Sequence, residues 1–236
     1  MGDLADIILY SFLSGVTVFF GGLFRKIENF PEGKKKEEFL HSIVAFGGGI
    51  LVSAVALVLV PKGIKELTLI PIIIIFIAGA ICFFLLDEFI SSQGGTKAQL
   101  MAMLMDFIPE AIALGAVFAH DKALGLLLAI FIGLQNLPES FNSFSDLVKS
   151  GISETKVLVI FIPLSFCGVA GAVLGYLFLG GFPKIIAGLM LFAASGILYL
   201  TFQDIAPLAK MEKNWRPALG ASLGFLVGII GQKIIG

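Results

Sequence analysis

The chain has 236 residues, of which 58% are hydrophobic and 14% are charged, with a mean hydropathy of +1.01 and a formal net charge of −1. Soluble domains carry roughly 25% charged residues, so this composition excludes an ordinary soluble protein. The near-zero net charge also argues against a nucleic-acid-binding surface, which needs an excess of basic residues.

Eight apolar stretches follow one another along the chain, each long enough to cross a bilayer as an α-helix. A spanning helix needs about 18 or more mostly apolar residues. We place the eight helices approximately at 6–24, 40–61, 67–87, 98–118, 124–147, 157–180, 182–204 and 217–235. We therefore predict an all-α, polytopic membrane protein with one transmembrane domain over residues 1–236.

Basic residues indicate the orientation of this domain. Eleven of the 16 lysines and arginines fall in loops on one side, and the loop at 25–39, with five of them, contributes most of the bias. Lysine and arginine are enriched in cytoplasmic loops. We expect loop 25–39 to be cytoplasmic, both termini to be extracytoplasmic, and the protein to lie in a plasma or inner membrane.

Two short polar motifs interrupt the fourth and fifth predicted helices: Asp106-Phe-Ile-Pro-Glu110 and Gln135-Asn-Leu-Pro-Glu139. Both follow one template, in which a polar residue, two spacers and a proline precede a glutamate. Residues four apart share one face of a helix, so the first and last residues of each motif project together. Pro109 and Pro138 each free a carbonyl one turn earlier, because proline has no N–H to donate. Each motif thus offers two side-chain ligands and one backbone oxygen.

The carboxylates of these motifs are costly in hydrocarbon and need a counter-charge. An aspartate at the centre of a spanning helix costs about 2.5–3.5 kcal/mol. Neither predicted helix contains a lysine or arginine. A divalent cation would balance the charge, and carboxyl groups that share protons and hold the helices together are the alternative. The predicted metal ligands are Asp106, Glu110, Gln135 and Glu139, with Asn136 at the margin.

These motifs resemble those of the ZIP (Zrt/Irt-like protein) family of divalent metal transporters. The family pattern His-Asn-x-Pro-Glu-Gly is matched by residues 106–111, and His/Gln-Asn/Asp-x-Pro-Glu-Gly is matched by residues 135–140. Segments 46–61, 171–176 and 195–207 resemble further helices of the family in the same order.

The resemblance implies a single transporter domain of eight helices with extracellular termini, embedded in a lipid bilayer, and a homodimer. It also implies transport of a divalent cation (Zn, Fe, Mn or Cd) into the cytoplasm. The metal is then a substrate, and the resemblance implies neither a prosthetic group nor enzymatic activity.

The departures from the family pattern predict one metal site instead of two. Asp106 replaces a histidine, and Phe107 replaces an asparagine that helps bind a second metal in two-metal members. Gly168 and Val169 stand where those members have a bridging Glu-Pro, and Val58 stands where an entrance ligand is common. A ligand set without histidine or cysteine favours Mn²⁺ or Fe²⁺ over Zn²⁺.

The remaining polar residues suggest a path to the cytoplasm. The candidate exit-path residues are Asp204, Gln203, Asn142 and Ser143. The resemblance suggests this role for Asp204, for which a helix-end position at the headgroups is the alternative. We expect Asp87, at the end of the third helix, and His41, at the start of the second, to lie at the membrane interface.

Two other functions remain open on the sequence alone. A metal-binding or sensing relative that does not transport would explain the missing second-site ligands. An intramembrane enzyme that uses paired carboxylates is the other alternative. It is disfavoured because the chain lacks a His-Glu-x-x-His motif, a nucleophile next to a base and an arginine placed for phosphate.

Overall fold

The computed structural model describes residues 2–29, 31 and 33–235, without the side chains of residues 2, 93, 95–99 and 102. The helices are α1 (Gly2–Ile27), α2 (Lys34–Ala54), η1 (Val55–Leu59), α3 (Val60–Glu66), α4 (Leu69–Gln93), α5 (Gly95–Phe118), α6 (Lys122–Lys149), α7 (Glu154–Leu179), α8 (Pro183–Leu200), η2 (Thr201–Ile205), α9 (Ala206–Ala209) and α10 (Arg216–Ile235). Over the described residues there is no β-strand, and the predicted all-α class is confirmed.

The helices confirm a multi-pass membrane protein. Seven segments of the described chain are long and apolar enough to span a bilayer: Asp3–Ile27, Lys34–Glu66, Leu69–Ser92, Lys122–Lys149, Glu154–Leu179, Pro183–Ala209 and Arg216–Ile235. The predicted span at 98–118 corresponds to α5, which is not among the seven and whose first turns contain several undescribed side chains. The count of eight stays a prediction.

Two of these segments are continuous helices interrupted by one wider, π-helical turn. η1 joins α2 to α3, and η2 joins α8 to α9. In both, a proline follows as the second residue after the π-turn, at Pro61 and Pro207. Proline removes one backbone hydrogen bond and clashes with the preceding turn. A local π-turn lets a membrane helix satisfy the freed groups and continue.

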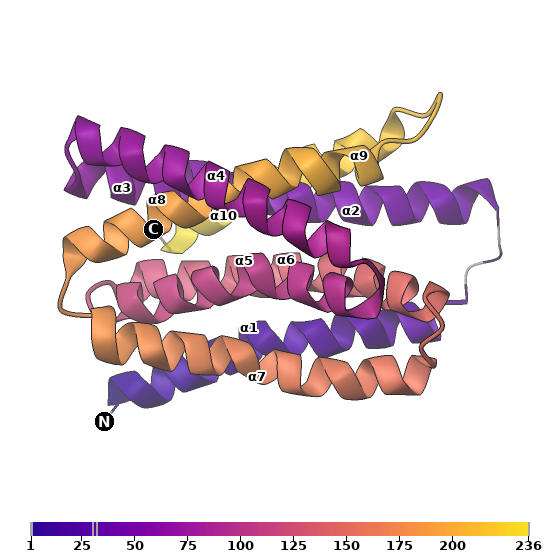
Figure 1. The fold of residues 1–236 in the computed structure, drawn as a ribbon, viewed down its shortest axis with the longest axis horizontal. Helices are drawn as coiled ribbons and strands as arrows, with labels where there is room; N and C mark the ends of the chain where they lie inside the picture. Colours follow the sequence, from indigo (N-terminus) through magenta and orange to yellow (C-terminus); the bar gives the residue numbers. More distant parts are fainter. Residues whose placement is uncertain (1, 30, 32, 236) are drawn as a thin grey trace.

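The helices pack in two groups, seen in the lower and upper halves of Figure 1. The α5–α6 group consists of α1, α5, α6 and α7, which pack mainly on one another. The α2–α8 group consists of α2, α3, α4, α8, α9 and α10. In it, α9 and α10 pack on α2, and α3 and α4 pack on α8. The two groups meet mainly where α2 contacts α6 and α8 contacts α5, so the two motif helices lie at the boundary.

Close backbone contacts occur inside each group. A Cβ added to Gly115 of α5 would lie 1.7 Å from the carbonyl oxygen of Ala172 in α7. One added to Gly49 of α2 would lie 2.0 Å from the carbonyl oxygen of Ala221 in α10. Small residues permit such approaches between membrane helices. Each group is therefore joined by helix backbones in direct contact.

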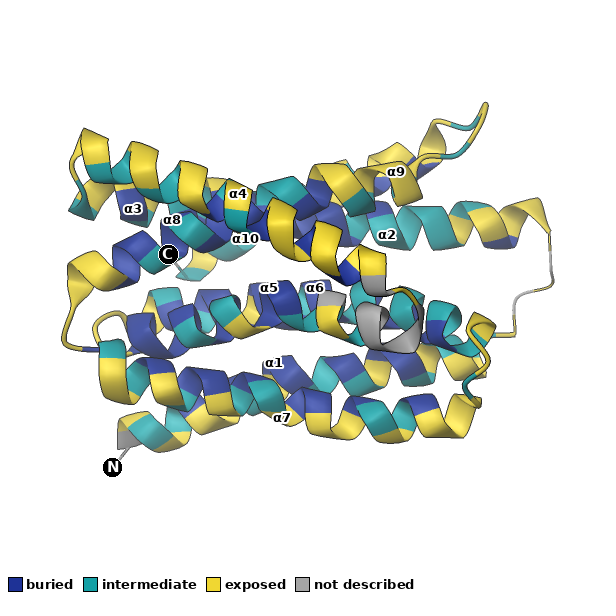
Figure 2. Cartoon of the chain, in the orientation of Figure 1, coloured by how far each residue is buried: buried dark blue, intermediate teal, exposed yellow. Residues whose placement is uncertain are grey.

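Burial increases toward the boundary between the groups (Figure 2). In the most apolar 18-residue stretch of α6, 67% of the residues are buried, whereas in that of α4 only 11% are buried. The exposed side chains of α4 are mostly large and apolar, including Ile77 and Phe84. In a bilayer this outer face is solvated by lipid, and the buried polar residues of α5 and α6 are enclosed by protein.

Candidate metal site and inner cavity

The two motifs lie in unbroken helices, with Pro109 inside α5 and Pro138 inside α6. The side chains of Asp106, Glu110 and Gln135 are buried. Glu139 is partly buried. Three carboxyl groups and one amide thus lie at the boundary between the two helix groups.

The four side chains form two pairs across the helices. Gln135 Nε2 donates a hydrogen bond to Glu110 Oε2. Asp106 and Glu139 are neighbours across the same two helices, and both line one cavity. Each pair therefore joins one residue of α5 to one residue of α6.

The pair Asp106–Glu139 lines a cavity of about 370 Å³. Its walls come from the second half of α2, the first half of α5, and the last parts of α4, α6 and the α8–α9 segment. These parts meet at the end of the molecule that carries the α1–α2 connection, on the right of Figure 1. We call this end the inner end and the hollow the inner cavity.

The inner cavity is lined by acidic side chains. Its five carboxylates are Asp87, Asp106, Glu139, Asp146 and Asp204. No lysine or arginine of the described chain is among its lining residues. Such a surface attracts cations and repels anions.

The pair Glu110–Gln135 faces a separate void of about 10 Å³ on the opposite, outer side. Apart from this pair, the void is enclosed by apolar residues: Ala54, Leu59, Ala113, Leu128, Phe131 and Ile132. Gln135 Oε1 is buried there, and it has no hydrogen-bond partner within the described residues. An unpaired buried amide oxygen beside a carboxylate is a suitable pair of ligands for a hard cation.

The four predicted ligands do not form one closed coordination shell in this conformation. Across the described residues, no three His, Cys, Asp or Glu side chains converge closely enough to hold a metal ion together. Asn136, predicted at the margin of the site, faces α1, where its Nδ2 donates to the carbonyl of Ser14 at 3.2 Å. The predicted ligands therefore lie in two pairs, and the Asn136 amide joins α6 to α1.

The candidate exit-path residues have different positions. Asn142, Ser143 and Asp204 line the inner cavity, and Asp204 lies on η2. Gln203 is exposed and does not line the cavity. The polar side of α6 therefore continues from the motif into the cavity, as its sequence suggested.

Asp87 lies in the cavity wall, and the expectation of a helix-end position was wrong. α4 continues six residues beyond it, to Gln93. Its carboxylate accepts hydrogen bonds from Tyr199 Oη at 2.9 Å and from Ser91 Oγ at 3.3 Å. An acidic residue in an otherwise apolar segment was the sequence signal for a buried polar contact. The sequence could not identify the partner, because Tyr199 of α8 lies far from Asp87 along the chain.

His41 also has a defined partner. Its Nδ1 lies 2.6 Å from the carbonyl oxygen of Leu208. This contact joins α2 to α9 at the mouth of the inner cavity, which Leu208 lines. The Tyr199–Asp87 and His41–Leu208 bonds hold the chain on both sides of η2.

The side chain of Phe107 occupies the space beside the motif of α5. It is 3% exposed, and a Cβ added to Gly168 of α7 would lie 2.5 Å from its Cζ. Packing of the ring against a glycine leaves no room for an acidic side chain there. This arrangement supports the expectation of a single metal site.

Comparisons with known proteins agree with the resemblance seen in the motifs. No family model matches the chain. It is 26% identical over 152 residues to zinc transporter ZIP13 of Pongo abelii, covering 59% of this chain and 46% of that protein. It is 27% identical over 143 residues to zinc transporter SLC39A7 of Homo sapiens, covering 58% of this chain and 30% of that protein.

Human zinc transporter ZIP13 is 25% identical over 129 residues, which cover 50% of this chain and 34% of that protein. The chain thus aligns with less than half the length of these curated relatives. They are zinc transporters of the ZIP family, so the resemblance to that family is confirmed. All three are named as transporters, in agreement with the expectation that the chain is not an enzyme.

Proposed function

We propose that this protein moves a divalent metal cation across the membrane into the cytoplasm, with Asp106, Glu110, Gln135 and Glu139 as its ligands. The observation that carries the proposal is the position of the two ligand pairs. They lie between an apolar closure on one side and a wide acidic cavity on the other. The names of the relatives, which are zinc transporters, support the same class of substrate.

The inner cavity gives a cation a favourable path from the site to the inner end. A metal leaving Asp106 and Glu139 enters a cavity that Asn142, Ser143 and the carboxylate of Asp204 also line. Inward movement of charge +2 through a potential of 100 mV, negative inside, is favourable by about 4.6 kcal/mol. The potential and the metal gradient therefore supply the driving force.

Metal binding requires the two pairs to approach each other. An ion between them would replace the Gln135–Glu110 hydrogen bond and would be bound by Asp106 and Glu139 as carboxylates. We infer that the α5–α6 group moves relative to the α2–α8 group in this step. The close contacts of α1 and α7 with α5 and α6 favour movement of all four helices together. Protons bind to the carboxyl pair when the metal leaves.

The ligand set consists of oxygen atoms alone, because neither histidine nor cysteine is among the four residues. Oxygen ligands suit Mn²⁺ and Fe²⁺, and carboxylates also bind Zn²⁺ and Cd²⁺. We propose Mn²⁺ or Fe²⁺ as the preferred substrate, with Zn²⁺ and Cd²⁺ transported less well. We also propose a homodimer in a plasma or inner membrane, with loop 25–39 cytoplasmic and both termini outside.

Uptake into liposomes tests the proposal. The purified protein should take up Mn²⁺, Fe²⁺, Zn²⁺ or Cd²⁺, and Glu110→Ala and Glu139→Ala should each reduce uptake to the level of empty liposomes. Each substitution removes one member of a ligand pair. Glu154→Ala, in the exposed first turn of α7, is the matched control and should keep full uptake.

The alternatives give different results in the same assay. Metal binding without uptake by the unmodified protein would indicate a sensor. Hydrolysis of a lipid or peptide without metal uptake would indicate an intramembrane enzyme. Full uptake by either glutamate variant would exclude the assigned site.

A further inference from the structure

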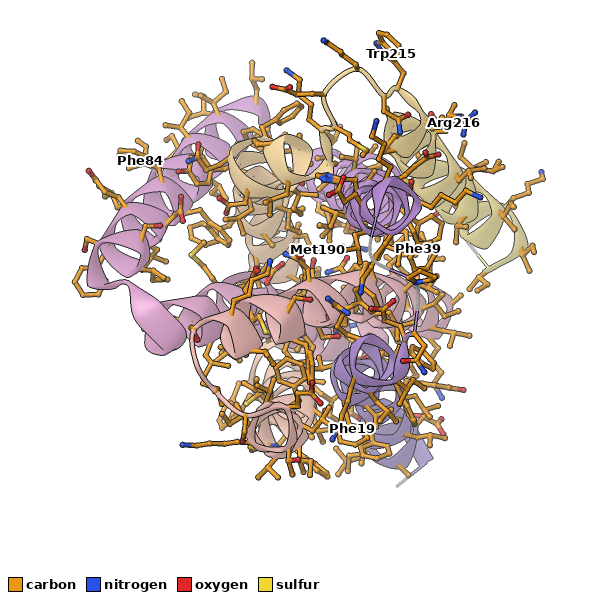
Figure 3. All side chains as sticks on the ribbon, turned by 90° about the vertical axis from the view of Figure 1, so that its right-hand side faces the viewer. Phe19, Phe39, Phe84, Met190, Trp215 and Arg216 are labelled. Atoms are coloured by element: carbon orange, nitrogen blue, oxygen red, sulfur yellow. The ribbon has the colours of Figure 1, made fainter. Side chains whose placement is uncertain are left out.

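The connection between α9 and α10 presents the single tryptophan of the chain to its surroundings. The side chain of Trp215 is 83% exposed and directly precedes α10, one of the candidate membrane spans. Figure 3 shows Trp215 projecting from the edge of the molecule, with Arg216 nearby. A tryptophan that flanks a span lies at headgroup level, where its ring meets acyl chains and its N–H meets water.

The same connection carries an excess of positive charge. Lys210, Lys213 and Arg216 are exposed, and Glu212 is the one acidic residue between them. Arg216 contacts Glu38 of α2, with Nη1 3.4 Å from Oε1, but its side chain is still 78% exposed. Three exposed basic residues thus share this short connection with the tryptophan.

The connection is held in a defined shape. Met211 and Asn214 form an antiparallel bridge, and Lys213 between them has a φ of 56°. Asn214 Nδ2 donates to Glu38 Oε2 at 3.0 Å, which ties the connection to α2. The backbone that carries the basic residues therefore needs little ordering before they bind a ligand.

We propose that residues 210–216 bind the headgroups of anionic phospholipids in the membrane leaflet at the inner end. The indole of Trp215 anchors the connection at the level of the glycerol groups, and the three basic side chains contact lipid phosphates. Basic groups beside a span are attracted to an anionic leaflet. The partner is a lipid because Trp215 borders the span and is held at that depth. This surface is separate from the metal ligands, so it does not depend on the proposed transport.

The single tryptophan makes a direct test possible. The protein is reconstituted in vesicles of phosphatidylcholine and phosphatidylglycerol at one fixed ratio, with bromine on the acyl chains of one lipid or of the other. We expect bromolipid to quench the emission of Trp215 in both preparations. Quenching per brominated molecule should be stronger when phosphatidylglycerol carries the bromine, because the anionic lipid is enriched at the connection.

Charge variants separate this enrichment from simple proximity to the membrane. The combined substitutions Lys210→Gln, Lys213→Gln and Arg216→Gln should abolish the difference between the two lipids, while general quenching remains. Lys184→Gln with Lys233→Gln, two exposed lysines at the outer end, should keep the difference. Addition of soluble inorganic phosphate should not remove it, since the bound group is a lipid.

Equal quenching by the two brominated lipids in the unmodified protein would overturn the proposal. So would an absence of quenching, which would place Trp215 in water. Competition by soluble phosphate would show that the phosphate alone, and not the lipid, is recognised. Metal uptake is not part of the measurement, so the result is independent of the proposed transport.

Discussion

Gln135 combines two features that suit a metal ligand. Its Nε2 is bound to Glu110, and its buried Oε1 has no hydrogen-bond partner in the described chain. An unsatisfied buried polar atom costs about 1–3 kcal/mol. A cation that accepts this oxygen as a ligand would remove that cost, so the residue contributes to affinity and to the choice of metal.

Gln135→His should therefore change selectivity. Imidazole nitrogen is a softer ligand than amide oxygen and suits zinc better than manganese. We expect the ratio of Zn²⁺ to Mn²⁺ uptake to rise in competition assays with both metals present. An unchanged ratio would show that Gln135 does not contact the transported ion.

The contact of Phe107 with Gly168 gives a second prediction at this scale. Gly168→Glu alone forces a side chain into the ring of Phe107, because even its Cβ would lie 2.5 Å from Cζ. Overpacking of this kind costs about 1–3 kcal/mol. We expect a lower unfolding temperature in detergent for this single variant.

Phe107→Asn combined with Gly168→Glu relieves the overlap and adds two oxygen ligands. The double variant should regain stability, and its bound metal, measured by elemental analysis, should rise from one ion to two. A stoichiometry of one in the stable double variant would contradict the single-site interpretation of Phe107.

The π-turn η2 links backbone geometry to the inner cavity. It carries Asp204 into the cavity wall and lies between the Tyr199–Asp87 and His41–Leu208 bonds. Pro207 follows and cannot donate the hydrogen bond that a regular α-helix would make there. The position of Asp204 thus depends on the wider turn before this proline.

Pro207→Ala should straighten the helix and move Asp204 away from the cavity. Alanine favours a helix interior over proline by about 3 kcal/mol, so the variant should be at least as stable as the unmodified protein. Its maximal uptake rate should nevertheless fall. Pro163→Ala, at an exposed proline inside α7 and away from the cavity, is the control and should transport normally. Normal uptake by Pro207→Ala would mean that η2 has no role in release.

The elements were largely predictable from the sequence, but their interruptions were not. Hydropathy located the long apolar segments because lipid requires nearly continuous apolar runs. It ended the third helix at Asp87, since it could not reveal that Tyr199 satisfies this carboxylate. The π-turns and the division of the ligands into two pairs arise from contacts between distant helices, such as Gln135 with Glu110.

The molecule as a whole has a wide cavity at one end and a closed apolar region at the other. Helix periodicity predicted that the first and last residues of each motif share one face, and the structure divides the four between the inner cavity and the small outer void. Periodicity carries no information on how helices group, so the packing of α1 and α7 with the motif helices emerged only from the fold. The closed outer end and open inner end are properties of that grouping.

Cysteine labelling tests this asymmetry. Ser143→Cys, in a variant with Cys82 and Cys167 replaced by alanine, should react with a membrane-impermeant maleimide added from the cytoplasmic side and not from outside, because Ser143 lines the inner cavity. Leu128→Cys, beside the closed void, should react from neither side. Reaction of the Ser143 variant from outside alone would reverse the proposed orientation.

The small void beside Glu110 also determines where an electric field acts. Once water fills the inner cavity of about 370 Å³, its interior is close to the potential of the compartment it opens to. Most of the transmembrane voltage must then fall across the short apolar layer formed by residues such as Leu59 and Phe131. An ion that crosses this layer moves through nearly the full voltage, which is worth about 2.3 kcal/mol per charge per 100 mV. Its release into the cavity then crosses almost none of the voltage. The membrane potential should therefore accelerate entry of the metal ion through the apolar layer and leave the rate of its release into the inner cavity nearly constant.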